Sequence, residues 1–404
     1  MCARRQLLYL SHFAHVDPLD RIQELGDFAD FSIRSAMAAF LARPGEAQNL
    51  EAARQLLASM VAEAGPEGTR TRMEAARLLG ILPDDFGPLL SQLLADADVE
   101  VAREAVRSVG QVRKRRLVPE LLDHLVDPRL APDVTDVLAR FGDSIVGNLR
   151  DCLTDPTTSR AVKYEISTVL GNIGTQAASH TLMEHLLDSD ASFRLRILSA
   201  SNNLHRRHPE LKCDTQMLET ALAAEILGHY RSYQIVARLD RLAENDQAVG
   251  EALSESMKLE IKRVFLLLEL LYPYRDFSTA YIGLQSKSIT VHDNALEFLD
   301  TVLKGQLREI LVPLLDGKVT ATERASIADR LVPVRIENSE QAAAALVASD
   351  DPWLRSCGAY AIGALGLNSL FDGLNRCLMD PDPLVRETAR LAKSRLEPTQ
   401  AAGA

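Results

Sequence analysis

The strongest concentration of residues suited to binding chemistry is a basic segment, REAVRSVGQVRKRR, at residues 103–116. Six basic residues face a single acid, Glu104, so its local charge is 6 − 1 = +5. The whole chain carries 45 basic and 56 acidic residues and a net charge of −11. A local basic excess attracts anions, lipid headgroups or an acidic partner. The sequence therefore predicts a partner-binding patch at Arg113, Lys114, Arg115 and Arg116, with a solvated turn as the alternative.

A second polar group lies in the segments YPYRDFSTAY (272–281) and HDNALEFLD (292–300). Three of its residues step by three along one predicted helix, beside an apolar stripe of Leu296, Leu299 and Leu303. These side chains either line a ridge that contacts a partner or form hydrogen bonds between neighbouring repeats. The candidate residues are Tyr274, Arg275, Asp276, Tyr281, Asn294, Glu297 and Asp300.

Motifs for catalysis, metal binding or cofactor binding are missing from the sequence. Neither GxxxxGK[ST] nor GxGxxG occurs, so the familiar phosphate-binding loops are absent. The five cysteines form no CxxC pair, and the spacings of His180 with His185 and of His205 with His208 favour solvated histidines over metal ligands. No nucleophile stands beside a recognisable base, although sites assembled from distant repeats would escape this search. We expect no catalytic residue, no metal, no cofactor and no enzymatic activity.

The elements that must position these residues are helices in a repeating pattern. Leu and Ala dominate, and aromatic residues make up only 5%. An Asp-rich turn, an amphipathic helix and a small closing residue recur at intervals of 29 to 32 residues, as between Gly110, Gly142 and Gly171 and then Asn202. The turn residues Asp96, Asp127, Asp155, Asp188 and Asp380 are predicted to cap the following helices. A single hairpin cannot bury its apolar stripe, so the pattern predicts an all-α solenoid of stacked hairpins.

The segments DPDPLVRETA (380–389) and SDDPWLRSCGA (349–359) resemble the HEAT repeat of armadillo-type proteins. Arg386, Arg355 and Arg194 occupy the usual arginine position, which Ala102 takes in the first clear unit. The resemblance implies a right-handed solenoid, and the missing His-Glu dipeptide removes the iron-binding pattern of HEAT-repeat hydroxylases. We predict poorly defined helical repeats at 1–85, HEAT repeats at 86–210, irregular long helices at 211–288, HEAT-like repeats at 289–396 and a flexible tail at 397–404.

The most hydrophobic stretch, VFLLLELLYPYRD (264–276), is too short to cross a membrane, because a span needs about 20 apolar residues. It predicts a buried helix over 250–272, preceded by a helix at about 214–231. With VLARFGDSIVGNLRDCLTDP (137–156) and LRILSASNNLHRRHPEL (195–211), the run 264–316 resembles the soluble HEAT region of bacterial ATP/ADP translocase-family proteins. The chain lacks the membrane segments and the cyclic-nucleotide domain of that family, so transport is not implied.

These observations favour a non-enzymatic scaffold or regulatory module that binds a protein partner, such as a membrane transporter domain of a translocase-like nucleotide transporter. We expect it in the cytoplasm, including the inner face of the membrane, with no membrane span and no nucleic-acid partner. The alternative is a HEAT-like enzyme or nucleic-acid-binding solenoid, similar to glycosylases or bilin lyases. The single tryptophan, Trp353, lies far in sequence from the basic segment, which disfavours a base-stacking site.

Overall fold

The computed structural model describes residues 31–42, 47–82, 86–245 and 247–396. Every regular element in these ranges is an α-helix or a short 3₁₀-helix, and helices pack mainly against their neighbours in sequence. The predicted all-α solenoid of stacked HEAT-like hairpins is therefore confirmed. The first part of the predicted 1–85 segment and the predicted tail at 397–404 lie outside the described residues.

The chain divides into two compact units, residues 1–181 and 182–404, and the division falls inside the predicted 86–210 block. In the first unit, helices of successive hairpins pack against each other, as α5 does against α7 and α7 against α9. Its helices are α3 (Phe31–Leu41), α4 (Ala47–Val61), α5 (Gly65–Leu79), α6 (Gly87–Leu94), α7 (Val99–Val112), η1 (Arg115–Leu117), α8 (Val118–Asp123), α9 (Ala131–Arg140), η2 (Gly142–Ile145), α10 (Val146–Thr154) and α11 (Arg160–Ile173), followed by α12 (Gln176–Met183) at the division.

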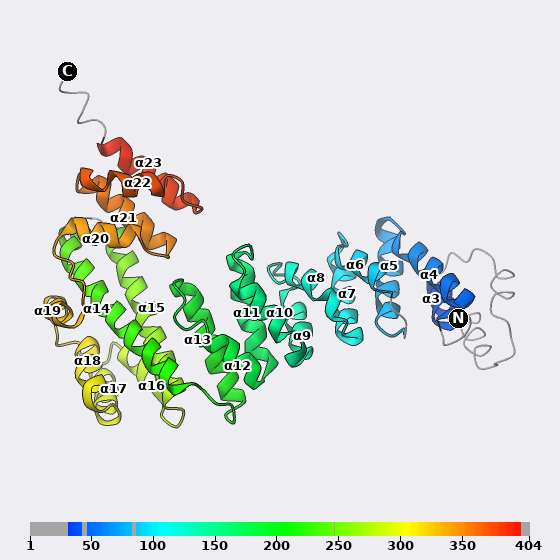
Figure 1. The fold of residues 1–404 in the computed structure, drawn as a ribbon, viewed down its shortest axis with the longest axis horizontal. Coiled ribbons are helices and arrows are strands. Elements are labelled where there is room, and N and C mark those ends of the chain that lie inside the picture. Colours follow the sequence, from blue (N-terminus) through cyan, green and yellow to red (C-terminus); the bar gives the residue numbers. More distant parts are fainter. Residues whose placement is uncertain (1–30, 43–46, 83–85, 246, 397–404) are drawn as a thin grey trace, which may run out of the picture. The chain divides into compact units, whose positions relative to one another are not determined.

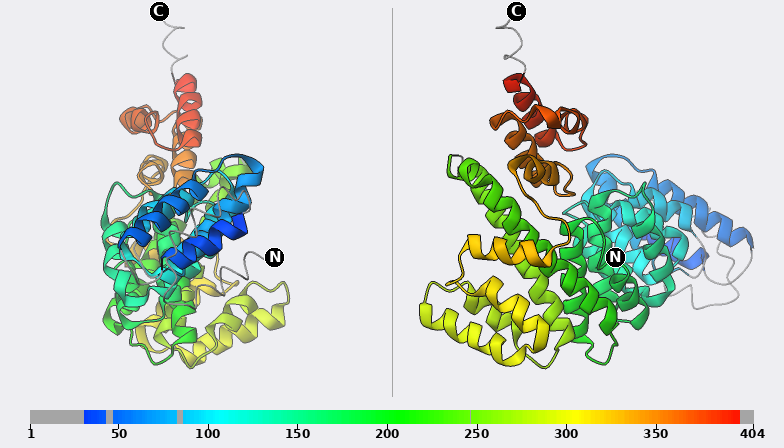
Figure 2. Two further views of the ribbon diagram at one scale, coloured as in Figure 1. Left: turned by 90° about the vertical axis from the view of Figure 1, so that its right-hand side faces the viewer. Right: turned by 60° about the vertical axis from the view of Figure 1, so that its left-hand side comes forward.

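The second unit is built around a long antiparallel hairpin, α14 (Thr215–Asn245) and α15 (Gln247–Leu271), which runs through it in Figure 1. Figure 2 shows the shorter helices α16–α18 and α20–α23 gathered toward its two ends. The other helices of the second unit are α13 (Ala191–Arg207), α16 (Phe277–Leu284), α17 (Ile289–Val302), α18 (Gly305–Leu315), α19 (Ala321–Leu331), α20 (Ser339–Val347), α21 (Pro352–Ala364), η3 (Asn368–Leu370), α22 (Phe371–Cys377) and α23 (Pro383–Leu396).

In three of the Asp-rich turns, two aspartates form the turn and cap the following helix, where the sequence predicted one aspartate for the cap. In the turn before α23, the Asp380 carboxylate accepts the backbone N–H of Asp382 at 2.9 Å, and Asp382 in turn accepts the N–H of Leu384 at 2.8 Å. Asp96 with Asp98 and Asp188 with Asp190 repeat the arrangement before α7 and α13. In these three turns the predicted residue fixes the turn, and the residue two positions later caps the helix. The capping prediction was wrong for Asp127 and Asp155: α9 begins after Leu130, which makes no side-chain cap, and Ser159 caps α11 by accepting the N–H of Val162.

The arginine of the HEAT-like position ties each turn to the next repeat. Arg355 donates to both carboxylate oxygens of Asp380, at 2.7 and 2.9 Å, and to the carbonyl oxygens of Ser349 and Asp350. Arg386 and Arg194 bind the carbonyls of their own turns in the same way. A bidentate guanidinium–carboxylate pair adds geometric specificity as well as energy. The arginine position predicted from the resemblance thus stabilises the Asp-rich turns, and Arg355 also connects its turn to the next one.

Several helix ends differ from the predicted ones. Gly110 lies inside α7, where an added Cβ would come within 2.9 Å of Val137, and Gly171 lies inside α11. Asn202 lies inside α13 and donates at 2.9 Å to the carbonyl oxygen of Leu266 in α15. These small residues therefore permit or make contacts between helices instead of ending them. The helix predicted at 214–231 continues to Asn245, because residues 232–245 contain neither glycine nor proline.

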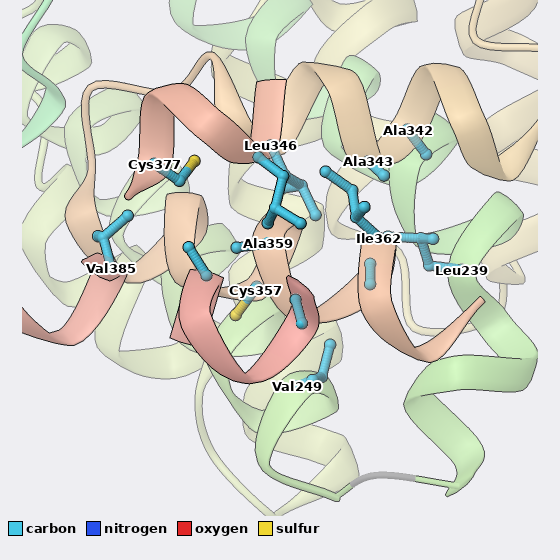
Figure 3. Close-up of a cluster of buried hydrophobic side chains, with 14 of the residues drawn as sticks. Leu239, Val249, Ala342, Ala343, Leu346, Cys357, Ala359, Ile362, Cys377 and Val385 are labelled. Atoms are coloured by element: carbon cyan, nitrogen blue, oxygen red, sulfur yellow. The ribbon is translucent and has the colours of Figure 1, made fainter. Parts of the chain in front are cut away.

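The hydrophobic stretch 264–271 forms the last two turns of α15 and is buried, as predicted. Val264, Phe265 and Leu268 are at most 2% exposed, and Phe265 packs edge-on against Phe277 of α16. At the other end of the hairpin, Leu239 and Val249 join a separate core with α20–α23 (Figure 3), which includes Leu346 and Ile362. No helix among the described residues has the length and apolar character needed for a membrane span.

Candidate functional site

The predicted basic patch forms the turn between α7 and η1, in the first unit. Arg113 ends α7 in the left-handed conformation, with φ of 48°, and its N–H donates to the carbonyl oxygen of Val109. Arg113, Lys114, Arg115 and Arg116 are all exposed. A left-handed residue reverses the chain direction at a helix end. The consecutive basic side chains therefore lie on an exposed turn.

The other two basic residues of the segment have acidic partners within the repeats. Arg103 pairs with Glu100 and, at 3.1 Å, with Asp133 of α9. Arg107 lies 3.7 Å from Glu104 and 3.5 Å from Asp133. The turn at residues 113–116 itself carries four basic residues, a charge of +4, whereas Arg103 and Arg107 lie beside acids of their own and the next hairpin. Arg116 packs against Gly87, where an added Cβ would clash with its guanidinium group.

The structure does not bring the second predicted group together through shared contacts. Tyr274 is 97% exposed and Arg275 is exposed. Asp276 caps α16 by accepting the N–H of Thr279 at 2.9 Å, and hydrogen bonds from Thr279 lower the pKa of its carboxyl group. The ring of Tyr281 lies 5.2 Å from that of Phe265, and burial raises the pKa of its hydroxyl group. Asp276 and Tyr281 therefore have local structural roles.

The remaining members of that group lie along α17. Asn294 and Glu297 are exposed, whereas Asp300 forms a two-bond ion pair with Arg308 of α18 at 2.7 and 2.8 Å. The hydrogen bond from Arg308 lowers the pKa of the Asp300 carboxyl group. For Asp300, the structure therefore agrees with the second of the two interpretations, a hydrogen bond between neighbouring helices.

The α14–α15 hairpin carries buried polar groups that the sequence did not indicate. Glu225 of α14 is 6% exposed and lies between two guanidinium groups, with Arg194 at 2.7 Å and Arg263 at 2.9 Å. This trio occupies the wall of a 510 Å³ groove between α13, the hairpin and the α20–α21 turn. Arg194 has the HEAT-like position, but its partner is a helix residue, because α14 replaces the short hairpin that would have supplied a turn aspartate.

A second groove, of 440 Å³, lies between the hairpin and helices α16 and α18. Its wall includes His229, which is 2% exposed and whose Nδ1 lies 2.7 Å from Oε2 of Glu260. The other oxygen of Glu260 accepts a hydrogen bond from Ser232 at 2.8 Å. The ring of Tyr233 packs edge-on against His229. A histidine followed 31 residues later by a glutamate has no recognisable spacing, so no local sequence signal could have found this pair.

The histidines and cysteines do not assemble a metal site in the part of the chain that the structure describes, where no group of three His, Cys, Asp or Glu side chains could hold an ion. Cys213 lies 3.3 Å from Nε2 of His205. Burial raises the pKa of the Cys213 thiol to about 11 and lowers the pKa of His205. Both groups are therefore neutral near pH 7, so this thiol is not an activated nucleophile.

No family model matches the chain. Among solved structures, one similar to this chain is human deoxyhypusine hydroxylase in complex with glycerol, at 16% sequence identity. The match covers 91% of this chain and 97% of the other, with a TM-score of 0.17. At this TM-score the likeness carries no residue role and no activity over to the chain.

The expectation that the chain is not an enzyme needs correction. It rested on missing motifs, and a matched structure with no more than a distant likeness is itself an enzyme. Side chains far apart in sequence can meet in a helical-repeat protein without a local motif, as the ion pairs of Glu225 with Arg194 and Arg263 show. Missing motifs therefore do not exclude catalysis, and we withdraw the exclusion.

Proposed function

We propose that the chain is a HEAT-like solenoid module that binds an acidic segment of a protein partner through the turn at residues 113–116. One observation carries the proposal: Arg113, Lys114, Arg115 and Arg116 are consecutive and exposed on one turn of an acidic protein. A stacked-helix scaffold holds such a turn in a fixed position, which lowers the ordering cost of binding.

Charge explains why an acidic protein segment is favoured over the other anions. The net charge of −11 repels duplex DNA and anionic membranes, whose charge is spread over large surfaces. A short acidic segment meets the basic turn alone and avoids most of that repulsion. The resemblance to the HEAT region of bacterial ATP/ADP translocase-family proteins makes a cytoplasmic segment of a transporter domain the first partner to test, and a cytoplasmic location belongs to this proposal.

The test is the affinity of a labelled peptide rich in Asp and Glu, measured by fluorescence anisotropy. The variant Lys114→Glu/Arg115→Glu leaves the helix-ending Arg113 and the packed Arg116 in place. We expect it to weaken binding by at least tenfold, with the wild-type affinity falling steeply with salt because exposed charges are screened. The control Lys262→Glu/Lys304→Glu makes the same charge change at two exposed lysines of the second unit and should retain binding.

Phosphatidylglycerol vesicles and a DNA duplex serve as competing probes. Equal loss in both double variants would reduce the effect to overall charge and overturn the proposal. Binding to vesicles or duplex, with none to the peptide, would also overturn it. Circular dichroism should show unchanged helix content in both variants, because exposed charges contribute little to stability.

A further inference from the structure

The 440 Å³ groove between the α14–α15 hairpin and helices α16 and α18 has the size and lining of a site for an uncharged small molecule. Pockets that bind small molecules typically enclose about 300–1,000 Å³ and are mainly apolar, with a few placed polar groups. No acidic side chain is among the described lining residues, and Lys258 is exposed and paired with Glu255 at 3.2 Å. The apolar lining includes Val236, Leu253, Met257, Ile261, Leu284 and Leu314.

One polar atom of a buried side chain in this groove lacks a partner. The His229 side chain is 3% exposed, and its Nδ1 lies 2.7 Å from Oε2 of Glu260. Nε2 has no hydrogen-bond partner among the described residues and is not sealed off from solvent. Because His229 lines the groove and is otherwise covered, Nε2 faces the groove. Buried polar atoms are nearly always hydrogen-bonded, so Nε2 marks the position of a ligand atom.

The contacts behind the ring decide what Nε2 can bind. The Glu260 carboxylate accepts the hydroxyl group of Ser232 at 2.8 Å through Oε1 and the N–H of Nδ1 through Oε2. A neutral imidazole carries one N–H and one acceptor nitrogen, so a proton on Nδ1 leaves Nε2 as the acceptor. The ring of Tyr233 packs edge-on against His229, which fixes the direction of Nε2. The matching ligand atom is therefore a hydrogen-bond donor, and a hydroxyl group provides one without adding charge.

We propose that this groove binds an uncharged molecule with an apolar body and a hydroxyl group. The hydroxyl group donates its hydrogen bond to Nε2 of His229. The apolar body packs against aliphatic residues of α15, α16 and α18, including Leu253, Leu284 and Leu314. This site lies in the second unit and is independent of the basic turn at residues 113–116.

Isothermal titration calorimetry with 1-octanol and methyl heptyl ether, at about pH 8 where ordinary imidazoles are neutral, tests the proposal. The two molecules are isomers of similar length, and only the alcohol donates a hydrogen bond. We expect octanol to bind about three- to tenfold more tightly, the scale of one hydrogen bond between uncharged groups. His229→Phe should abolish this preference. Leu284→Trp, which fills the groove, should weaken both ligands, and Ile282→Trp, at an exposed position of the same helix outside the groove, should weaken neither.

The ¹⁵N chemical shift of His229 Nε2 gives a second readout, which does not require a variant to fold. We expect an unprotonated Nε2 in the free protein, and a shift on addition of octanol that the ether does not produce. A proton on Nε2 in the free protein would overturn the proposal, as would an equal shift with the ether.

Equal affinities for octanol and the ether would also overturn it, as would failure of both to bind or octanol binding that survives Leu284→Trp. If His229→Phe fails to fold because Glu260 loses its partner, the ¹⁵N shift and Leu284→Trp still decide the outcome. The variant Lys114→Glu/Arg115→Glu should bind octanol as the wild type does, so this result stands or falls separately from the acidic-peptide result.

Discussion

Replacing Leu299 by alanine is the sharpest test of how the second unit is held together. Leu299 is 0% exposed and lies in α17, a helix that packs against α16 and α18. Removing a buried leucine side chain beyond Cβ costs about 2–5 kcal/mol, from lost apolar burial plus the cavity left behind. For a unit of about this size, each kcal/mol lowers the melting temperature by about 2–4 °C. Leu299→Ala should therefore lower it by about 4–20 °C.

The adjacent residue provides the matched control. Asp300 lies in the same helix, and its ion pair with Arg308 is exposed to solvent, with the two side chains 45% and 51% accessible. Asp300→Ala should cost a small fraction of the Leu299→Ala loss, because solvent screens such pairs. Thermal and urea unfolding followed by circular dichroism measure both variants. Equal losses would mean that Leu299 does not lie on the buried stripe, and the packing of α17 would be wrong.

Two further predictions concern other contacts of the second unit. An added Cβ at Gly363 of α21 would lie 2.6 Å from Cα of Ala392, so Gly363→Ala should destabilise the protein by about 1–3 kcal/mol. Gly228 has open space around it, so Gly228→Ala should stabilise the protein by up to about 1 kcal/mol. Chemical denaturation measures both changes. A Gly363→Ala variant as stable as the wild type would contradict the close approach of α21 and α23. Burial raises the pKa of Asp380, but the hydrogen bonds from Arg355 and from the Asp382 N–H, together with the charges of Arg355 and Arg386, outweigh it and leave this pKa below the ordinary 3.8. The pair therefore stabilises the fold above about pH 4 and loses its effect as pH falls further. Acid titration of Arg355→Met should show a weaker dependence of stability on pH below 4 than the wild type, and an unchanged dependence would rule out this pair as a source of it.

The basic turn was predictable because it depends on neighbours in sequence. Four consecutive basic residues after an amphipathic helix can hardly be buried, so Arg113 to Arg116 are exposed as their charge implies. Which basic residues of the segment form ion pairs with the next hairpin was not predictable. Arg103 and Arg107 reach Asp133 of the next hairpin, and only packing decides which arginines meet an acid.

The helical repeat could likewise be predicted, since each amphipathic stripe and each Asp-rich turn depends only on residues within one short segment of the chain. The role of Asn202 could not. It was predicted as a closing residue, and it instead joins α13 to α15 through a carbonyl 64 positions away. A polar residue inside a helix is read correctly only when its partner on another helix is known.

The sequence by itself determined the helices, the stacking of hairpins and the position of the turn arginines, because these depend on periodicity and on contacts between adjacent repeats. Tertiary structure alone decided the two grooves of the α14–α15 hairpin. Glu225 meets Arg194 and Arg263 across 31 and 38 residues, and His229 meets Glu260 across 31. These pairs depend on the register in which long helices pack side by side. That register follows from the sum of many buried apolar contacts and is encoded in no short segment of the chain.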